Sequence, residues 1–240
     1  MTIMARRLTC AGALTTLMLL GACSMMPTAY PTVSSPPPSG THVRLMRGLG
    51  GAALSPGVDQ IAASAAKIHG VTLVKVYEYT QTQQIADEIN AEGLDIKEVI
   101  GGYSCGANAS PVVASGVSRS IDMLTVIQAS EWCGGVPIPK NVKRAQETYN
   151  PDCAQTAGLG CKELELGPGF NPANFTVIIR PDCHPCADVN PDAQADMLRA
   201  ISSVANPAPT TLAHSFLAPS RAPARKHQVN RVVLYHGQHL

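Results

Sequence analysis

Charge is scarce in this chain, and neither sign is in excess. Charged residues make up 15% of its 240 residues, and 18 basic side chains against 17 acidic ones leave a formal net charge of +1. Proteins that bind nucleic acids concentrate Lys and Arg against the phosphates. The composition therefore argues against a nucleic-acid partner, and the chain also contains no internal repeats.

The chain also lacks an apolar run long enough to span a bilayer. Residues 8–22 are apolar and follow Arg6 and Arg7, but a spanning helix needs about 20 apolar residues. We interpret residues 1–22 as an export signal. The segment Leu20-Gly21-Ala22-Cys23 resembles the bacterial lipobox. That resemblance implies a lipid anchor on Cys23, contact with the membrane through this lipid, and a periplasmic or cell-surface protein. An ordinary secretory signal cleaved nearby is the alternative.

Both ends of the mature chain lack the composition of a packed core. Residues 23–40 are rich in Pro and Ser, which predicts an extended tether. Residues 206–240 contain prolines and basic residues but no acidic residue, which predicts a basic, mostly disordered tail. Within that tail, the run from Val232 to Tyr235 could add a short edge strand. One globular domain is expected over residues 41–205.

The chain contains eight cysteines. Six cysteines remain outside the signal and the lipobox, and an even number in an oxidising compartment favours disulfides. Sequence proximity suggests Cys153 with Cys161 and Cys183 with Cys186. Cys105 is then left to pair with Cys133.

The hydrophobic pattern between the two ends alternates between strand and helix. Residues 121–127 form a largely apolar run, as in a parallel strand that is buried on both faces. Such alternation predicts an α/β protein with a mainly parallel sheet. The expected strands are His42–Met46, Val71–Tyr79, Ile96–Ile100, Ile121–Ile127 and Phe175–Arg180. Helices are expected after Ser55, over Gln84–Ala91, over Ala107–Val117 and after Asn190. Residues 133–174 are expected to form loops.

One motif predicts a catalytic nucleophile. Gly102-Tyr103-Ser104-Cys105-Gly106 is a G-x-S-x-G sequence between a predicted strand and a predicted helix, which is the context of a nucleophile elbow. A serine hydroxyl needs a base to accept its proton. His42 begins a strand and His69 ends a helix, whereas His184 follows the last strand. Sites in wound sheets form at the carboxyl ends of the strands, so His184 is the predicted base.

Two backbone N–H groups are candidates for stabilising an oxyanion. In hydrolases of this plan, one donor is the residue after the nucleophile, and the other lies in the loop after an earlier strand. These positions correspond to Cys105 and to Leu49, which lies in Gly48-Leu49-Gly50-Gly51. A plain flexible turn is the alternative interpretation of that loop.

The order of strand, glycine-rich loop, elbow, histidine and final helix resembles the α/β-hydrolase superfamily. Residues 101–107 are similar to the elbow of cutinases, which are small esterases without a lid. The resemblance implies a three-layer fold with about five to six strands flanked by helices. It also implies a serine esterase or lipase that acts on carboxylic esters without a cofactor or metal.

The catalytic acid is the weakest part of this resemblance. Cutinases carry an aspartate inside a disulfide-closed loop, but the residues between Cys153 and Cys161 include no acidic one. Glu131 is the favoured candidate and Asp152 the alternative, since both preserve the order serine, acid, histidine. Asp182 is too close to His184 in sequence to bond its Nδ1.

Two other functions remain open from the sequence. Cys183-His184-Pro185-Cys186 is a C-x-x-C motif, which thiol-disulfide oxidoreductases use. A non-catalytic surface module on a hydrolase scaffold is also possible, because a fold does not determine a function. If the protein is an esterase, the lack of a lid insertion favours short-chain or soluble esters as substrates. The oligomeric state is not predicted.

Overall fold

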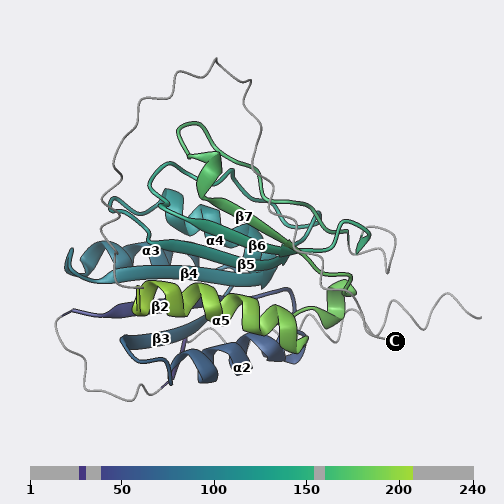
Figure 1. Ribbon diagram of the computed structural model, residues 1–240, viewed down its shortest axis with the longest axis horizontal. Helices are drawn as coiled ribbons and strands as arrows, with labels where there is room; N and C mark the ends of the chain where they lie inside the picture. Colours follow the sequence, from purple (N-terminus) through teal and green to yellow (C-terminus); the bar gives the residue numbers. More distant parts are fainter. Residues whose placement is uncertain (1–26, 31–38, 154–159, 208–240) are drawn as a thin grey trace, which may run out of the picture.

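The computed structural model describes residues 27–30, 39–153 and 160–207, which form a seven-stranded sheet and four α-helices (Figure 1). The protein is an α/β protein with a mostly parallel sheet, as the alternating pattern predicts. The signal, Cys23, most of the predicted tether and the tail from residue 208 onward, including 232–235, lie outside the described residues. Within the described residues, no helix combines the length and apolar character needed to cross a membrane.

The strands follow the order β1-β3-β2-β4-β5-β6-β7 across the sheet. Strands β2 to β7 pair in parallel, and β1 pairs antiparallel with β3. The bounds are Thr28–Tyr30 for β1, Thr41–Arg47 for β2, Val71–Glu78 for β3, Lys97–Ser104 for β4, Met123–Ala129 for β5, Ala145–Tyr149 for β6 and Phe175–Ile179 for β7. Every residue of β5 is buried, which is typical of a central parallel strand.

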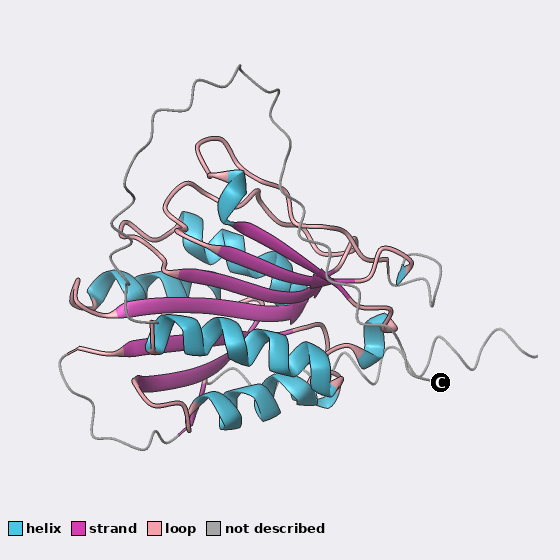
Figure 2. Cartoon of the chain, in the orientation of Figure 1, coloured by secondary structure: helices cyan, strands magenta, loops and turns pink. Residues whose placement is uncertain are grey.

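Helices cover both faces of the sheet (Figure 2). Their bounds are Pro56–Ala65 for α2, Thr82–Ala91 for α3, Cys105–Ser115 for α4 and Pro191–Ala205 for α5. Helices α2 and α5 pack together and share one apolar cluster with the sheet, and α3 and α4 contribute to a second cluster. The two clusters explain why the central strands are apolar on both sides.

The sheet has more strands than the five to six expected. Strand β6, Ala145–Tyr149, lies within the stretch expected to form loops, and it contains the polar residues Gln146 and Glu147. Strand β1 lies within the segment expected to be an unpacked tether. Both expectations are wrong for these strands, because neither has the apolar run or regular alternation from which a strand is predicted.

The order in which the chain adds strands to the sheet reverses between the parallel strands β2 and β4. Strand β2 leads through α2 to β3 on one side of it, whereas β4 leads through α4 to β5 on the other side. Ligand sites in open α/β sheets form at this point, beyond the carboxyl ends of the strands. The loop that begins at Gly48 and the residue Ser104 both lie at this edge.

Candidate functional site

Ser104 lies at a sharp turn between β4 and α4. It is the last residue of the strand and the N-cap of the helix, and its backbone has φ 56° and ψ −121°. Positive φ is uncommon for a residue with a side chain and is often associated with function. A Cβ on Gly102 would lie 2.4 Å from the backbone of Gly106, and one on Gly106 would lie 2.2 Å from the Met46 carbonyl oxygen. The turn therefore requires both glycines of the motif.

His184 meets Ser104 across this edge of the sheet. It begins a short 3-10 helix, His184–Cys186, after β7, and its Nε2 lies 2.8 Å from Ser104 Oγ. The imidazole is 3% exposed, and burial lowers its pKa below the ordinary value because the charged form loses hydration. A neutral imidazole at hydrogen-bond distance from a hydroxyl can act as a general base.

The other two histidines of the domain lie elsewhere. His42 Nδ1 is 3.0 Å from Glu92 Oε2 at the amino edge of the sheet, where Arg44 also pairs with Glu92. His69 Nδ1 lies 3.4 Å from Asn206 Oδ1 near the end of α5. Neither contacts Ser104, so His184 is the histidine that the fold brings to the serine.

Neither predicted acid reaches His184. Among the described residues, no carboxylate is hydrogen-bonded to this imidazole; its Nδ1 instead lies 3.2 Å from Cys161 Sγ. Glu131 is exposed and lies beside Gly160, and Asp152 is exposed with its backbone N–H bonded to the Asn150 side chain. The expected Ser-His-acid arrangement is therefore observed as a Ser-His pair with a sulfur in the third position.

Asp182 does not supply the missing carboxylate either. Its Oδ1 accepts a hydrogen bond from Asn190 Nδ2 at 2.7 Å, which turns the side chain toward the start of α5. Burial raises the pKa of this carboxyl above its ordinary value. Asp182 therefore belongs to the support of the histidine loop rather than to the imidazole.

Three residues that the sequence analysis did not single out support His184. The Tyr103 ring stacks against the imidazole at a centroid distance of 5.4 Å, and its hydroxyl donates to the His184 carbonyl oxygen. The Asp182 carbonyl oxygen accepts from Gln128 Nε2 at 3.2 Å and from Asn150 Nδ2 at 2.7 Å. Tyr103 lies in the x position of the motif, which carries no signal, and a positive φ at Gln128 is not readable from sequence.

The glycine-rich loop after β2 lies directly beside Ser104. The Gly48 N–H donates to the buried Ser55 Oγ at 3.0 Å, and a Cβ on Gly48 would come within 2.9 Å of Ser104 Cβ. Leu49 follows Gly48 in this loop, and Cys105 is the first residue of α4, where the N–H has no partner within the helix. Cys105 thus directly follows the serine, and Leu49 directly follows the glycine that approaches it.

An ion-pair network holds the start of the same loop. Arg47, the last residue of β2, pairs with Asp59 at 2.6 Å and with Glu78 at 2.9 Å. Its guanidinium is almost fully buried, and the two carboxylates replace the hydration that it loses. The backbone that enters Gly48 is therefore fixed to α2 and β3.

The three predicted disulfides are confirmed. They join Cys105 to Cys133, Cys153 to Cys161 and Cys183 to Cys186. The first ties the residue after Ser104 to the loop after β5, and the third closes the 3-10 helix that carries His184. All three disulfides therefore lie around Ser104 and His184.

A buried carboxylate joins the histidine segment to α2. Asp188 is 1% exposed, and its Oδ2 accepts the Gly57 N–H at 2.9 Å in the first turn of that helix. Burial raises the pKa of this carboxyl. A Cβ on Gly57 would lie 1.9 Å from the Asp188 carbonyl oxygen, so a glycine is needed here. The helix N-terminus favours the negative charge of Asp188.

Among the residues that the structure describes, two groups of side chains have donor atoms close enough together for a metal ion. Cys153, Cys161 and His184 form the first, but its sulfurs are joined in a disulfide and offer no thiolate. His42, Glu92 and Glu98 form the second, and Arg44 pairs with both of its carboxylates. Neither group is therefore assigned as a metal centre.

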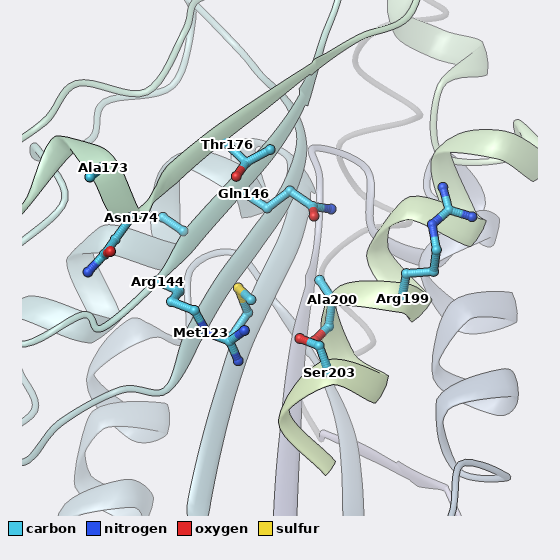
Figure 3. A pocket seen from close by; sticks show the side chains of 10 residues that line it. Met123, Arg144, Gln146, Ala173, Asn174, Thr176, Arg199, Ala200 and Ser203 are labelled. Carbon is cyan, nitrogen blue, oxygen red and sulfur yellow. The ribbon is translucent and has the colours of Figure 1, made fainter. Parts of the chain in front are cut away.

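A cavity of about 310 Å³ lies away from the Ser104 site. It opens between α5 and the first residues of β6 and β7, with Arg144 and Gln146 on the strand side and Ala200 and Ser203 on the helix side (Figure 3). Ser104 and His184 do not line it. This cavity is therefore separate from the candidate catalytic pair.

Apolar side chains are exposed on the loops that carry the candidate site. Leu49 and Leu54 lie in the loop after β2, Trp132 lies next to Cys133, and Val189 lies beside Asp188. Trp132 is 68% exposed, which is unusual for so large an apolar side chain. The loops that carry the candidate site therefore expose apolar surface.

No protein-family model matches the chain, and no curated protein matches its sequence. The chemistry of the site therefore follows from its own groups, which are a hydroxyl on a constrained turn and a buried imidazole.

Proposed function

We propose that the protein is a serine hydrolase that cleaves carboxylic esters, with Ser104 as the nucleophile and His184 as the general base. The observation that carries this proposal is the 2.8 Å contact between His184 Nε2 and Ser104 Oγ, made by a serine whose backbone φ is 56°. A buried serine can bond to histidine for structural reasons alone, but such a bond does not require a sterically restricted turn.

The reaction follows from the positions of these groups. His184 Nε2 accepts the hydroxyl proton while Ser104 Oγ attacks the ester carbonyl carbon, and the N–H groups of Leu49 and Cys105 receive the developing oxyanion. The imidazolium then gives its proton to the leaving alcohol, and an acyl-enzyme remains. Water, deprotonated by His184, then attacks the acyl carbon, and the bond to Ser104 Oγ breaks as the carboxylic acid leaves. The imidazolium returns its proton to Ser104 Oγ and restores the serine.

The site suggests both the substrate class and a modest rate. The exposed Leu49, Leu54 and Trp132 favour an ester with an apolar acyl or alcohol group. In serine proteases with a Ser-His-Asp triad, loss of a correctly placed acid lowers kcat by about 10⁴. We therefore expect slow turnover unless another group orients the imidazole.

The fold family and the cellular compartment are part of the same proposal. Two features support an α/β-hydrolase fold as part of this proposal. Helices cover both faces of a mostly parallel sheet, and the turn at Ser104 lies where the strand order reverses. Three disulfides favour an oxidising compartment. They are compatible with export and with a lipid anchor on Cys23.

Hydrolysis of p-nitrophenyl esters of graded acyl length tests the proposal. Ser104→Ala should abolish turnover. The matched control is Ser110→Ala, because Ser110 is a buried serine of the same helix whose Oγ donates to the Gly106 carbonyl oxygen at 2.9 Å. If folded wild-type protein hydrolyses no ester of the series, or if Ser104→Ala retains full activity, the esterase assignment is wrong and a non-catalytic module becomes the better description.

One observation keeps a thiol-disulfide oxidoreductase as the second candidate. Cys186, in the Cys183–Cys186 disulfide, is exposed to solvent. Reduction of insulin disulfides by dithiothreitol, with and without the protein, measures this activity. Acceleration that is lost in Cys186→Ala would support the redox function, and no acceleration would leave this disulfide a structural closure of the histidine loop.

A further inference from the structure

We propose that the Cys153–Cys161 disulfide takes the place of the catalytic acid, and that Cys161 is a positioning residue for the imidazole of His184. The inference rests on the proposed serine-hydrolase function. Its starting point is that Ser104 Oγ and Cys161 Sγ contact opposite nitrogens of one imidazole, at 2.8 Å and 3.2 Å.

The two contacts specify the tautomer of His184. For Nε2 to accept the Ser104 proton it must carry none, so the hydrogen of the neutral ring lies on Nδ1 and faces Cys161 Sγ. A catalytic carboxylate performs the same orienting function from this position. A disulfide sulfur is an uncharged and weak acceptor, so it can orient the ring but stabilises the imidazolium much less.

The position of Cys161 Sγ is fixed by structure beyond the disulfide. Cys161 forms an isolated β-bridge with Ser130, and the Lys162 N–H donates to the Ala129 carbonyl oxygen at 2.9 Å. The sulfur is buried, and Gln128 Oε1 lies 3.6 Å from it. The backbone at Cys161 is thus attached to the end of β5, which adjoins the strand carrying Ser104.

Tyr103 also contacts His184, on a face of the imidazole ring. Tyr103 stacks on the ring, and the Tyr103 hydroxyl bonds to the His184 backbone carbonyl. The ring is therefore held by stacking, by its backbone and by the sulfur, and it keeps the orientation needed by Ser104. What the site lacks, compared with a carboxylate triad, is a negative charge next to the imidazolium.

A matched pair of single variants separates the sulfur contact from the disulfide itself. Cys153→Ala and Cys161→Ala both break the same disulfide, but only Cys161→Ala removes the sulfur from His184 Nδ1. The readout is the second-order rate of Ser104 phosphonylation by a fluorophosphonate, followed by intact mass. Both variants are first compared with the wild type by circular dichroism and thermal unfolding.

We expect Cys161→Ala to react at least about tenfold more slowly than Cys153→Ala, a difference of about 1.4 kcal/mol in activation free energy. Equal rates for the two folded variants would overturn the proposal, because the disulfide would then act only by closing its loop. Wild-type labelling would remain in that case, so the proposed function would stand. Absence of wild-type labelling would instead contradict the function itself.

A carboxylate placed at the same position gives an independent measurement. In the double variant Cys153→Ala/Cys161→Asp, a negative charge would face His184 Nδ1 and favour the imidazolium. The pH midpoint of the labelling rate should rise by about one unit or more relative to Cys153→Ala. An unchanged midpoint in folded protein would show that residue 161 does not face the base, and would overturn the proposal. If this variant does not fold, the comparison of Cys153→Ala with Cys161→Ala decides.

Discussion

His184 Nε2 and Ser104 Oγ lie 2.8 Å apart although the two residues are 80 positions apart in the chain. The contact exists because β4 and β7 both end at the same edge of the parallel sheet. No described carboxylate bonds to the far side of the imidazole, where Cys161 Sγ lies at 3.2 Å. The strength of the base is therefore determined by burial.

The pH dependence of the reaction should show this directly. Burial lowers the pKa of His184 below 6.5, and only the neutral imidazole can accept the serine proton. The phosphonylation rate should therefore fall on acidification with a midpoint below pH 6.5, and it should be level above it. Rates measured from pH 4.5 to 8.5 check this. A midpoint at pH 7 or higher would indicate an unidentified negative charge beside the base.

The glycines of the elbow should be intolerant of substitution. Gly102→Ala places a Cβ 2.4 Å from the backbone of Gly106, and forced contacts of this kind cost about 1–3 kcal/mol or more. Urea unfolding should show this loss. Gly93→Ala is the matched control, since nothing lies within 4 Å of its added Cβ, and its stability should change little. Equal stability of the two variants would mean that the turn at Ser104 is less crowded than described.

The disulfides should differ in the stability that they supply. Cys105–Cys133 joins residues 28 apart and Cys183–Cys186 joins residues 3 apart. In the loop-entropy treatment their removal costs about 3–4 and about 2 kcal/mol respectively. Urea unfolding of Cys133→Ala and Cys186→Ala gives both values. The reverse order would show that the short disulfide stabilises the folded state by more than loop closure.

Glu147 should make the protein less stable as the pH rises. Its side chain is fully buried in β6, and burial raises its pKa from 4.5 to about 8. Between these values the carboxyl is neutral when folded and ionised when unfolded, so the unfolded chain binds fewer protons and stability falls with increasing pH.

We expect a Tm at least a few degrees lower at pH 8 than at pH 5, because about 1 kcal/mol moves the Tm of a domain of this size by about 2–4 °C. Glu147→Gln should reduce this dependence. The exposed Glu165→Gln serves as its control and should leave the dependence unchanged. If both variants behave like the wild type, the pH dependence arises at other groups, such as the buried Glu98, whose pKa burial raises to about 8.

The features that could be predicted from the sequence are local in the chain. The elbow is marked by Gly102 and Gly106, because the turn leaves no space for a Cβ at either position. The pairing of Cys153 with Cys161 and of Cys183 with Cys186 follows from their short separation. His184 could be selected because a histidine directly after the last parallel strand has to reach the edge where the other strands end.

The features that were missed depend on contacts between distant segments. Strand β6 could not be predicted because it contains a glutamate, Glu147, where a buried strand usually has an apolar residue. The burial of Glu147 depends on a distant partner, the Leu164 N–H, which donates to Glu147 Oε2 at 2.8 Å. Glu131 and Asp152 are the predicted acids, but the group at His184 Nδ1 is a sulfur. A contact between Cys161 and His184 leaves no pattern in the sequence, because it depends on the β-bridge that joins Cys161 to Ser130 at the end of β5.

Covalent labelling measures whether Ser104 is a nucleophile that His184 activates. Folded protein is incubated with a fluorophosphonate at pH 7.5, and the adduct is located by intact mass and peptide mapping. We expect one adduct on Ser104, absent in Ser104→Ala and strongly reduced in His184→Ala, with Ser110→Ala labelled like the wild type. An unlabelled Ser104 in folded wild-type protein, or undiminished labelling in His184→Ala, would contradict the activation of Ser104 by His184.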